Sequence, residues 1–211
     1  MRLNKIKVSI FLMISVCFLS LFYMARSVAA QNDPVALLQS IADNMIAGLK
    51  TNQATLKTKP EVVYRLARQY VVPHANLNEM SKRVLPPAIW NAATPSERSR
   101  FQQAFTTTLI RTYASALTSY QDQTIQFFPI RGNYQQSDSI TVNSEIRGGD
   151  HQPIQVSYRL LRQGDNWKLY DMSVEGVSML DSFRAQFADI LSHGNINDLL
   201  KRMTTHNKGS N

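Results

Sequence analysis

The side chains best suited to chemistry lie close together in the run from Asp171 to Ser178. Asp171 and Glu175 would share one face of a strand, and two carboxylates can act as an acid–base pair. Four residues along a strand separate them by about 13 Å, too far to share one water molecule. Ser178 lacks the glycine pattern of a nucleophile elbow. We therefore expect Asp171 to anchor a loop or ion pair, and Glu175 with Gly176 to form a strand-to-helix turn.

The remaining chemistry-bearing residues are scattered. No two histidines have metal-ligand spacing, and there is neither a phosphate loop nor a dinucleotide fingerprint. His74 follows a proline break and is the remaining candidate acid or base, although a lone histidine there is more often a surface or capping residue. The sequence thus predicts no catalytic residue, no metal site and no cofactor. The histidines are His74, His151, His193 and His206.

The N-terminal half of the chain after residue 30 has the periodicity of helices. Asp33–Pro34 is a helix N-cap with proline in the first helical position. Thr94–Glu97 is a capping box, which begins the longest helix. The predicted helices span residues 34–49, 60–70, 77–85 and 95–120.

The C-terminal half begins with alternating strands joined by short turns, which predicts an antiparallel meander. Two further helices are expected from Asp181 to Ser192 and over residues 197–203. This order predicts an α+β fold, a curved antiparallel sheet covered by helices. A bent sheet beneath the longest helix encloses a cone, either filled by its own side chains or open to a ligand. The predicted strands span residues 124–129, 140–146, 154–160 and 166–174.

Alternation in the last strand puts Tyr170, Met172 and Val174 on the inner face, with Trp167 on the far face. A one-residue slip would invert such an assignment. From periodicity alone, these residues and the apolar stripe of the longest helix are best interpreted as plain core. If the cone holds a ligand, its predicted lining is Phe105, Leu109, Tyr113, Ile125, Phe127, Val156, Tyr158, Tyr170, Met172, Val174 and Val177.

The first 30 residues have the pattern of a signal peptide. A basic start precedes the apolar block Val8–Met24, and the small residues Val28–Ala30 suit cleavage before Gln31. An uncleaved membrane anchor is the competing interpretation. We expect cleavage, which leaves residues 31–211 as a single domain. The sole cysteine, Cys17, lies in the leader, so no disulfide is expected to support the exported fold.

The net charge of +8 exaggerates the basic character of the exported protein. Four of the 23 basic residues and none of the 15 acidic ones lie in the leader, so the remainder carries +4. Such a charge has two interpretations: ordinary surface solubility, or weak attraction to anionic lipid headgroups or acidic partners. No basic cluster interleaves with aromatic residues, so no nucleic-acid partner is expected.

Several motifs together resemble the MlaC family, also called the toluene-tolerance auxiliary family. The likeness extends in order from about residue 35 to residue 203. Its motifs are Trp-Lys-Leu-Tyr-Asp at 167–171, Glu-Gly-Val-Ser-Met at 175–179, Phe-Arg-Ala-Gln-Phe at 183–187, and the helix segments 93–98 and 111–117.

The resemblance implies an NTF2-like cone with added N-terminal helices around an apolar lipid cavity. It implies a monomeric periplasmic carrier, with phospholipid as its cargo, that maintains outer-membrane lipid asymmetry. The implied partners are an outer-membrane MlaA-type lipoprotein–porin complex and the MCE-type component of an inner-membrane ABC transporter. Two alternatives remain open: a cone-fold enzyme that uses His74, and a periplasmic lipoprotein chaperone that binds acylated protein.

Overall fold

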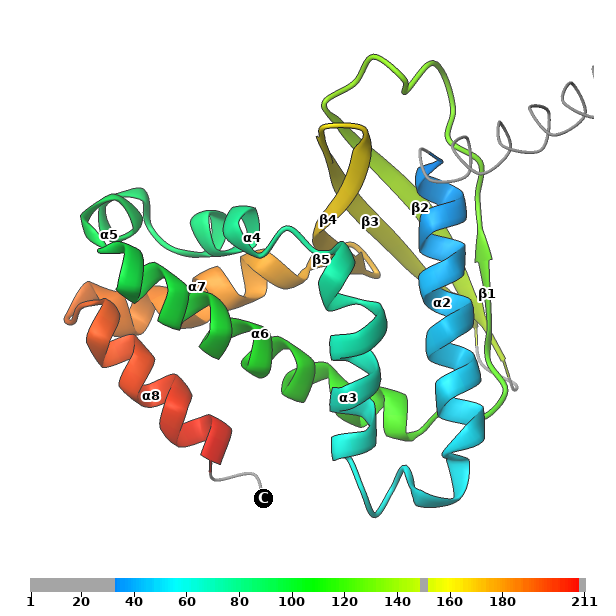
Figure 1. Cartoon of the computed structure of the whole chain (residues 1–211), viewed down its shortest axis with the longest axis horizontal. Coiled ribbons are helices and arrows are strands. Elements are labelled where there is room, and N and C mark those ends of the chain that lie inside the picture. The colour runs from blue at the N-terminus through cyan, green and yellow to red at the C-terminus, as the bar shows by residue number, and fades with distance from the viewer. Residues whose placement is uncertain (1–32, 149–151, 209–211) are drawn as a thin grey trace, which may run out of the picture.

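The computed structural model describes residues 33–148 and 152–208, so the predicted signal peptide and His151 lie outside the described residues. Figure 1 shows a twisted sheet with helices beside it, and a separate group of helices packed at its edge. The α+β class is confirmed. Within these two ranges, no helix combines the length and the apolar character needed to cross a membrane.

The sheet is an open antiparallel meander with the strand order β1-β2-β3-β4-β5, as the short turns predict. The last turn is tight because Glu175 and Gly176 adopt φ values of 49° and 81°, and glycine accepts this backbone region without a side-chain clash. The strands are β1 (Thr124–Phe127), β2 (Ser139–Arg147), β3 (Ile154–Gln163), β4 (Asn166–Val174) and β5 (Val177–Ser178).

A bulge in β4 changes the faces assigned to its residues. Arg159 of β3 pairs with Asp171, whereas the next β3 residue, Leu160, pairs with Leu169. Tyr170 is therefore the extra residue of the bulge, and the strand alternation shifts by one there. The prediction that Tyr170 shares a face with Met172 is wrong for this reason. The prediction that Trp167 lies on the far face is wrong for the same reason, since Trp167 pairs with Arg162 on the face of Leu160.

Helix α2 (Pro34–Thr51) lies across one face of the sheet, which we call the inner face (Figure 1). Its first turn is capped as predicted, because the Asp33 carboxylate accepts hydrogen bonds from the backbone N–H groups of Val35 and Ala36. Leu38 of α2 packs with Leu160 and other buried residues of the sheet. The longest helix was expected to cover the sheet, but α2 has this position.

The longest helix, α6 (Pro95–Thr118), packs mainly against α3, α4 and α8. Its predicted capping box is confirmed, since the Thr94 hydroxyl and the Glu97 carboxylate each accept a backbone hydrogen bond from the other residue. Pro87 begins a short helix that was not predicted from the sequence. The other helices are α3 (Glu61–Tyr70), α4 (Leu77–Val84), α5 (Pro87–Ala92), α7 (Met179–Ser192) and α8 (Ile196–Lys208), with single 3₁₀ turns at Gln53–Thr55 and Val72–His74.

The molecule thus has two lobes. The sheet lobe comprises the five strands with α2 and α3, and the helical lobe comprises α4 to α8 (Figure 1). Four phenylalanine rings fill the centre of the helical lobe, with ring centroids 5.3–6.0 Å apart in stacked, tilted and edge-on arrangements. Such pairs add stability beyond the area they bury. The rings belong to Phe101, Phe105, Phe183 and Phe187.

Candidate functional site

Seven of the eleven predicted lining residues share the inner face of the sheet. The strand registers show this directly, because residues paired across neighbouring strands point to the same side. Val156 pairs with Val174, which pairs with Val177, and Tyr158 pairs with Met172. The two β1 residues join the same face through their β2 partners. The seven are Ile125, Phe127, Val156, Tyr158, Met172, Val174 and Val177.

The other four predicted residues lie with the helical lobe. Phe105, Leu109 and Tyr170 are buried members of its core, and Tyr113 packs against that core. Burial, and then the negative charge of Asp171, raises the pKa of the Tyr113 hydroxyl. The structure therefore divides the predicted lining between a sheet set and a helical set. A ligand contact by any of them stays a prediction.

One cluster of buried apolar residues lies on the inner face of the sheet, and a second, separate cluster lies between helices. Helix α2 contributes to both: Leu38 belongs to the cluster on the sheet, whereas Met45 and Leu49 belong to a cluster with α3 and the end of α6. Ala42 lies between them on the same helix face, four residues after Leu38. It is buried, yet it belongs to none of the three clusters found among the described residues.

The inner face of the sheet also has a buried residue outside the clusters. Val156 is only 2% exposed but also belongs to none of those clusters. Ile125, Met172 and Val174 are half-buried apolar residues on the same face. We call these five residues the seam. The seam groups apolar residues of the inner face with Ala42 of α2, and none of its members belongs to the buried clusters among the described residues.

The polar groups beside the seam are hydroxyls. The Ser144 hydroxyl, which is fully buried, donates to the Tyr158 hydroxyl at 3.4 Å. Burial raises the pKa of Tyr158, although this hydrogen bond acts in the opposite direction. The Tyr158 ring packs on Phe127 with a centroid distance of 5.5 Å. Strand alternation could have found Ser144, but its residue type gave no reason to select it.

The inner face reaches solvent at the end of the sheet near the β2–β3 and β4–β5 turns. Ile154 and Val177 are large hydrophobic residues that stay exposed there, by 41% and 63%. Both lie on the inner face, through Ile154's pairing with Ile146 and Val177's pairing with Val174. We call Ile154 and Val177 the rim. Exposed apolar groups next to a buried apolar surface are typical of a ligand entrance or a contact surface.

Asp171 has the structural role expected for it. Its buried carboxylate accepts hydrogen bonds from the Ser178 hydroxyl at 2.7 Å and from the backbone N–H of Leu180 at 3.2 Å. It also pairs with Arg159 at 3.3 Å. A carboxylate placed at the first turn of α7 suits the helix dipole and caps free N–H groups. Asp171 therefore joins β4 to α7.

Glu175 also has its expected role at the turn. Its carboxylate accepts a hydrogen bond from the backbone N–H of Gln155, and its own backbone N–H donates to the Gln155 carbonyl at 2.9 Å. The two bonds hold the end of β4 against β3. Both carboxylates of the candidate acid–base pair are thus engaged in fold contacts.

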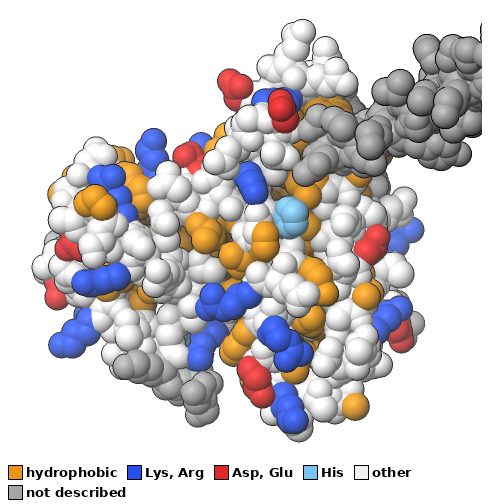
Figure 2. Space-filling model, viewed as in Figure 1, with side chains coloured by type: hydrophobic (Ala, Val, Ile, Leu, Met, Phe, Trp, Pro, Cys, Tyr) orange, Lys and Arg blue, Asp and Glu red, His pale blue; other side chains and the backbone are white. Residues whose placement is uncertain are grey.

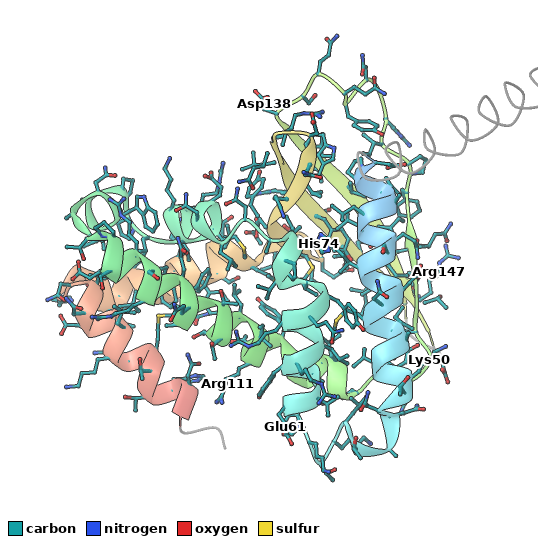
Figure 3. All side chains as sticks on the ribbon, in the orientation of Figure 1. Lys50, Glu61, His74, Arg111, Asp138 and Arg147 are labelled. Atoms are coloured by element: carbon teal, nitrogen blue, oxygen red, sulfur yellow. The ribbon has the colours of Figure 1, made fainter. Side chains whose placement is uncertain are left out.

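His74 lies where α3 meets the sheet (Figure 3). Figure 2 shows hydrophobic side chains gathered near the centre of the visible face. Burial, and then the positive charge of Lys168, lowers the pKa of His74. Lys168 itself donates to the Pro73 carbonyl at 2.8 Å. Across residues 33–148 and 152–208 there is no group of acidic, cysteine or histidine side chains able to hold a metal ion.

Two open depressions lie elsewhere. One of about 510 Å³ borders the loop after β1 and the adjoining part of β2. The other, of about 840 Å³, lies between α7 and α8 among mainly polar residues. None of the eleven predicted residues lines either depression. The two depressions are therefore separate from the seam.

The fold and the seam define a class of protein: a helix-backed antiparallel sheet with an apolar inner face and no acid–base pair among the described residues. The chain matches the MlaC protein family over residues 39–205 and belongs to that family.

Individual relatives agree with this assignment. The intermembrane phospholipid transport system binding protein MlaC of Haemophilus influenzae is 28% identical over 207 residues, which cover 95% of this chain and 94% of that protein. Toluene tolerance protein ttg2D of Pseudomonas putida is 29% identical over 175 residues, which cover 83% and 80% of the two chains.

A solved structure shows the same fold. The phospholipid-binding protein of Ralstonia solanacearum, determined in complex with a phospholipid, superimposes with a TM-score of 0.75. It is 27% identical in sequence, and the match covers 83% of this chain and 97% of that one. The relatives thus match most of the chain.

Proposed function

We propose that this protein is a periplasmic phospholipid carrier and that the seam receives the acyl chains. The observation that carries this proposal is the break between the two apolar clusters beneath α2, with Val156 and Ala42 buried outside both. The phospholipid bound to the Ralstonia relative supports the cargo class. The intermembrane phospholipid transport system named for the Haemophilus relative supports its use in movement between membranes.

The physical requirement for such a carrier is an apolar shield. Each methylene group transferred from water to an apolar environment is worth about 0.8 kcal/mol, so a two-chain lipid crosses an aqueous gap slowly unless it is covered. Half-buried Met172 and Val174 fit this task. Their exposed apolar surface gains from contact with an acyl chain, and methionine adapts its shape readily.

The rim suggests how cargo enters and leaves. A charged phosphate costs several kcal/mol to bury without a partner, so the headgroup stays in water near Ile154 and Val177 while the tails lie in the seam. The exposed rim then faces the complex that donates or accepts the lipid. The partners proposed are an outer-membrane MlaA-type lipoprotein–porin complex and an inner-membrane MCE-type transporter component.

No specific observation favours an enzyme. Asp171 and Glu175 are engaged in hydrogen bonds that hold the fold together. The charged side chain that affects the pKa of His74 is Lys168, and it lowers that pKa. We expect no turnover of phospholipid. The carrier proposal also predicts that free acylated peptides compete weakly with phospholipid, whereas a lipoprotein chaperone would prefer them.

The test is transfer of labelled phosphatidylethanolamine from donor to acceptor vesicles, followed by chromatography of the lipid. The expected result is faster transfer of intact lipid in proportion to protein concentration. Appearance of lysolipid or fatty acid that is lost in His74→Ala would support the enzyme instead. Stronger competition by a diacylated peptide than by phospholipid would favour the chaperone.

A further inference from the structure

Strand β2 is longer than β1, and part of its edge is open. β1 pairs with β2 only as far as the pair of Phe127 with Ser144. The backbone N–H of Phe128 still donates to the Asn143 carbonyl at 2.8 Å. Pro129 follows, and proline has no N–H to continue a ladder. From that point the chain leaves the sheet.

The backbone groups of Ser139 and Thr141 face this open edge. Asn143 accepts its hydrogen bond from the β1 side, whereas Asp138 accepts one from the backbone N–H of Arg162 on the β3 side at 2.8 Å. Alternate residues of an antiparallel strand bond to opposite neighbours. Ser139 and Thr141 therefore direct N–H and C=O toward the vacated side, and no described backbone group pairs with them there.

The open hollow of about 510 Å³ lies beside this edge. The loop after β1 forms its other wall with Ile130, Arg131 and Tyr134, while Thr141 and Asn143 line it from β2. Arg131 is the one charged residue among the described lining residues.

Arg162 fixes the loop that forms this wall. Its guanidinium donates to the backbone carbonyls of Tyr134, Gln135 and Ser137 at 2.8–3.2 Å and lies over the Trp167 ring. The hollow is therefore bounded by a strand edge on one side and by a hydrogen-bonded loop on the other. A segment that binds there finds a preformed wall, which lowers the entropy cost of binding.

We propose that the β2 edge at Ser139 and Thr141 binds an extended acidic segment of a partner polypeptide as an added antiparallel strand. Ser139 and Thr141 are two residues apart, and each directs its backbone N–H and C=O outward. An extended peptide backbone presents N–H and C=O groups at the same spacing, so it can form hydrogen bonds with both residues. The hollow accommodates its side chains, and the positive charge of Arg131 favours a carboxylate among them.

This edge and the rim lie at opposite ends of β3. Ser139 pairs with Leu161 near the end of β3, whereas the rim residue Ile154 begins that strand. In Figure 3, Asp138 marks the end of the sheet at which this edge begins. A partner held there leaves the rim uncovered.

The experiment uses the full exported chain and a panel of blocked peptides of roughly eight residues, alternating valine and threonine, with one glutamate at each position in turn. Backbone amide NMR signals report the site. We expect the signals of Ser139, Thr141 and Asn143 to shift on titration, and their hydrogen exchange to slow. If no peptide in the panel shifts these signals, the proposal is wrong.

Two variants sharpen the test. Thr141→Pro removes one outward backbone N–H without changing the hydrogen bonds to β3. It is expected to weaken peptide binding about tenfold, which is the effect of about one hydrogen bond. Thr141→Val keeps this N–H and should bind the peptide as the unchanged protein does. Arg131→Gln should weaken the glutamate peptides but not their glutamine counterparts. If Thr141→Pro binds as well as Thr141→Val, the edge is not the site.

A measurement on the unchanged protein covers the case in which Thr141→Pro fails to fold. A peptide N-methylated at the residue opposite Thr141 cannot donate its backbone hydrogen bond, and its binding should weaken by at least about tenfold. Undiminished binding of that peptide would overturn the proposal. Phospholipid content should be the same in Thr141→Val, Arg131→Gln and the unchanged protein, which separates this site from the seam.

Discussion

The helical lobe and the sheet lobe bury their apolar side chains in different ways. In the helical lobe, Phe105 is 1% exposed and lies within 6 Å of three other phenylalanine rings. In the sheet lobe, the apolar residues form two clusters that α2 spans without joining, and Val156 is buried outside both. One lobe is a closed core, and the other keeps apolar surface available beneath a helix.

This difference separates stability from binding. Rings packed at close distance leave no space for a ligand, and the loss of one creates a cavity. Half-buried residues such as Met172 and Val174 contribute less to stability because part of their surface still meets water. The closed lobe supplies the rigid support, and the seam of the sheet lobe supplies a surface that gains from a ligand.

The largest stability effect is expected at the phenylalanine cluster. Phe105→Ala removes a ring that contacts Phe101, Phe183 and Phe187, so the free energy of unfolding should fall by about 4 kcal/mol. Urea unfolding monitored by circular dichroism measures this. A loss below about 1.5 kcal/mol would mean that the helical lobe is loosely packed, and the contrast between the lobes would disappear.

The junction between the lobes should give the next effect. Asp171→Asn keeps the shape of the side chain but removes the charge that meets Arg159 and the first turn of α7, so we expect a loss of about 2 kcal/mol. Arg159→Gln is the comparison, with a loss below about 1 kcal/mol because Arg159 is partly solvated. Phospholipid content should stay unchanged in both. Loss of lipid in Asp171→Asn without loss of stability would give Asp171 a binding role.

The seam should tolerate truncation better than a closed core. Val174→Ala changes a half-buried residue, whereas Val84→Ala makes the same change at a fully buried position of the helical lobe. We expect a loss of about 1 kcal/mol or less at Val174 and about 2 kcal/mol at Val84. Equal losses measured by urea unfolding would show that the seam is packed as tightly as the core.

The smallest effect concerns His74. Its pKa is lowered in the folded protein, first by burial and then by Lys168, so the unfolded chain binds the proton more readily. The stability that depends on neutral His74 is complete above its ordinary pKa of about 6.5 and declines as the pH falls below it. His74→Gln should therefore show a shallower loss of unfolding free energy between pH 7 and pH 5. An unchanged pH slope would contradict the lowering of the His74 pKa by burial and by Lys168.

Local features of both lobes could be predicted from short-range chemistry. The caps at Asp33 and Thr94 follow from side-chain oxygens beside the first turns, and the turn at Glu175–Gly176 follows from the glycine. The meander follows from alternation and short connections. The α+β class and the seven inner-face residues can be predicted from these patterns, because each pattern depends only on residues close together in the sequence.

Long-range features could not be predicted in the same way. Alternation through β4 fails at Tyr170 because a bulge inserts one residue, and no residue type marks this. The apolar stripe of α6 with Phe105 and Leu109 suits a sheet-facing helix as well as a helix bundle, and the phenylalanines of α7 decide between them. The open edge beside Thr141 depends on where β1 ends relative to β2.

The most direct measurement of the proposed contrast is the phospholipid content of two neighbouring variants in β3, determined by native mass spectrometry after purification without detergent. Val156→Arg puts a charge into the seam on the inner face, while Ser157→Arg puts it on the opposite face of the same strand. Met172→Arg repeats the test at a half-buried position, where the long side chain reaches water more easily.

Folding of each variant is checked by circular dichroism. We predict phospholipid bound to the unchanged protein and to Ser157→Arg, and little or none bound to folded Val156→Arg and Met172→Arg. Full lipid occupancy in either inner-face variant would contradict the placement of the acyl chains in the seam.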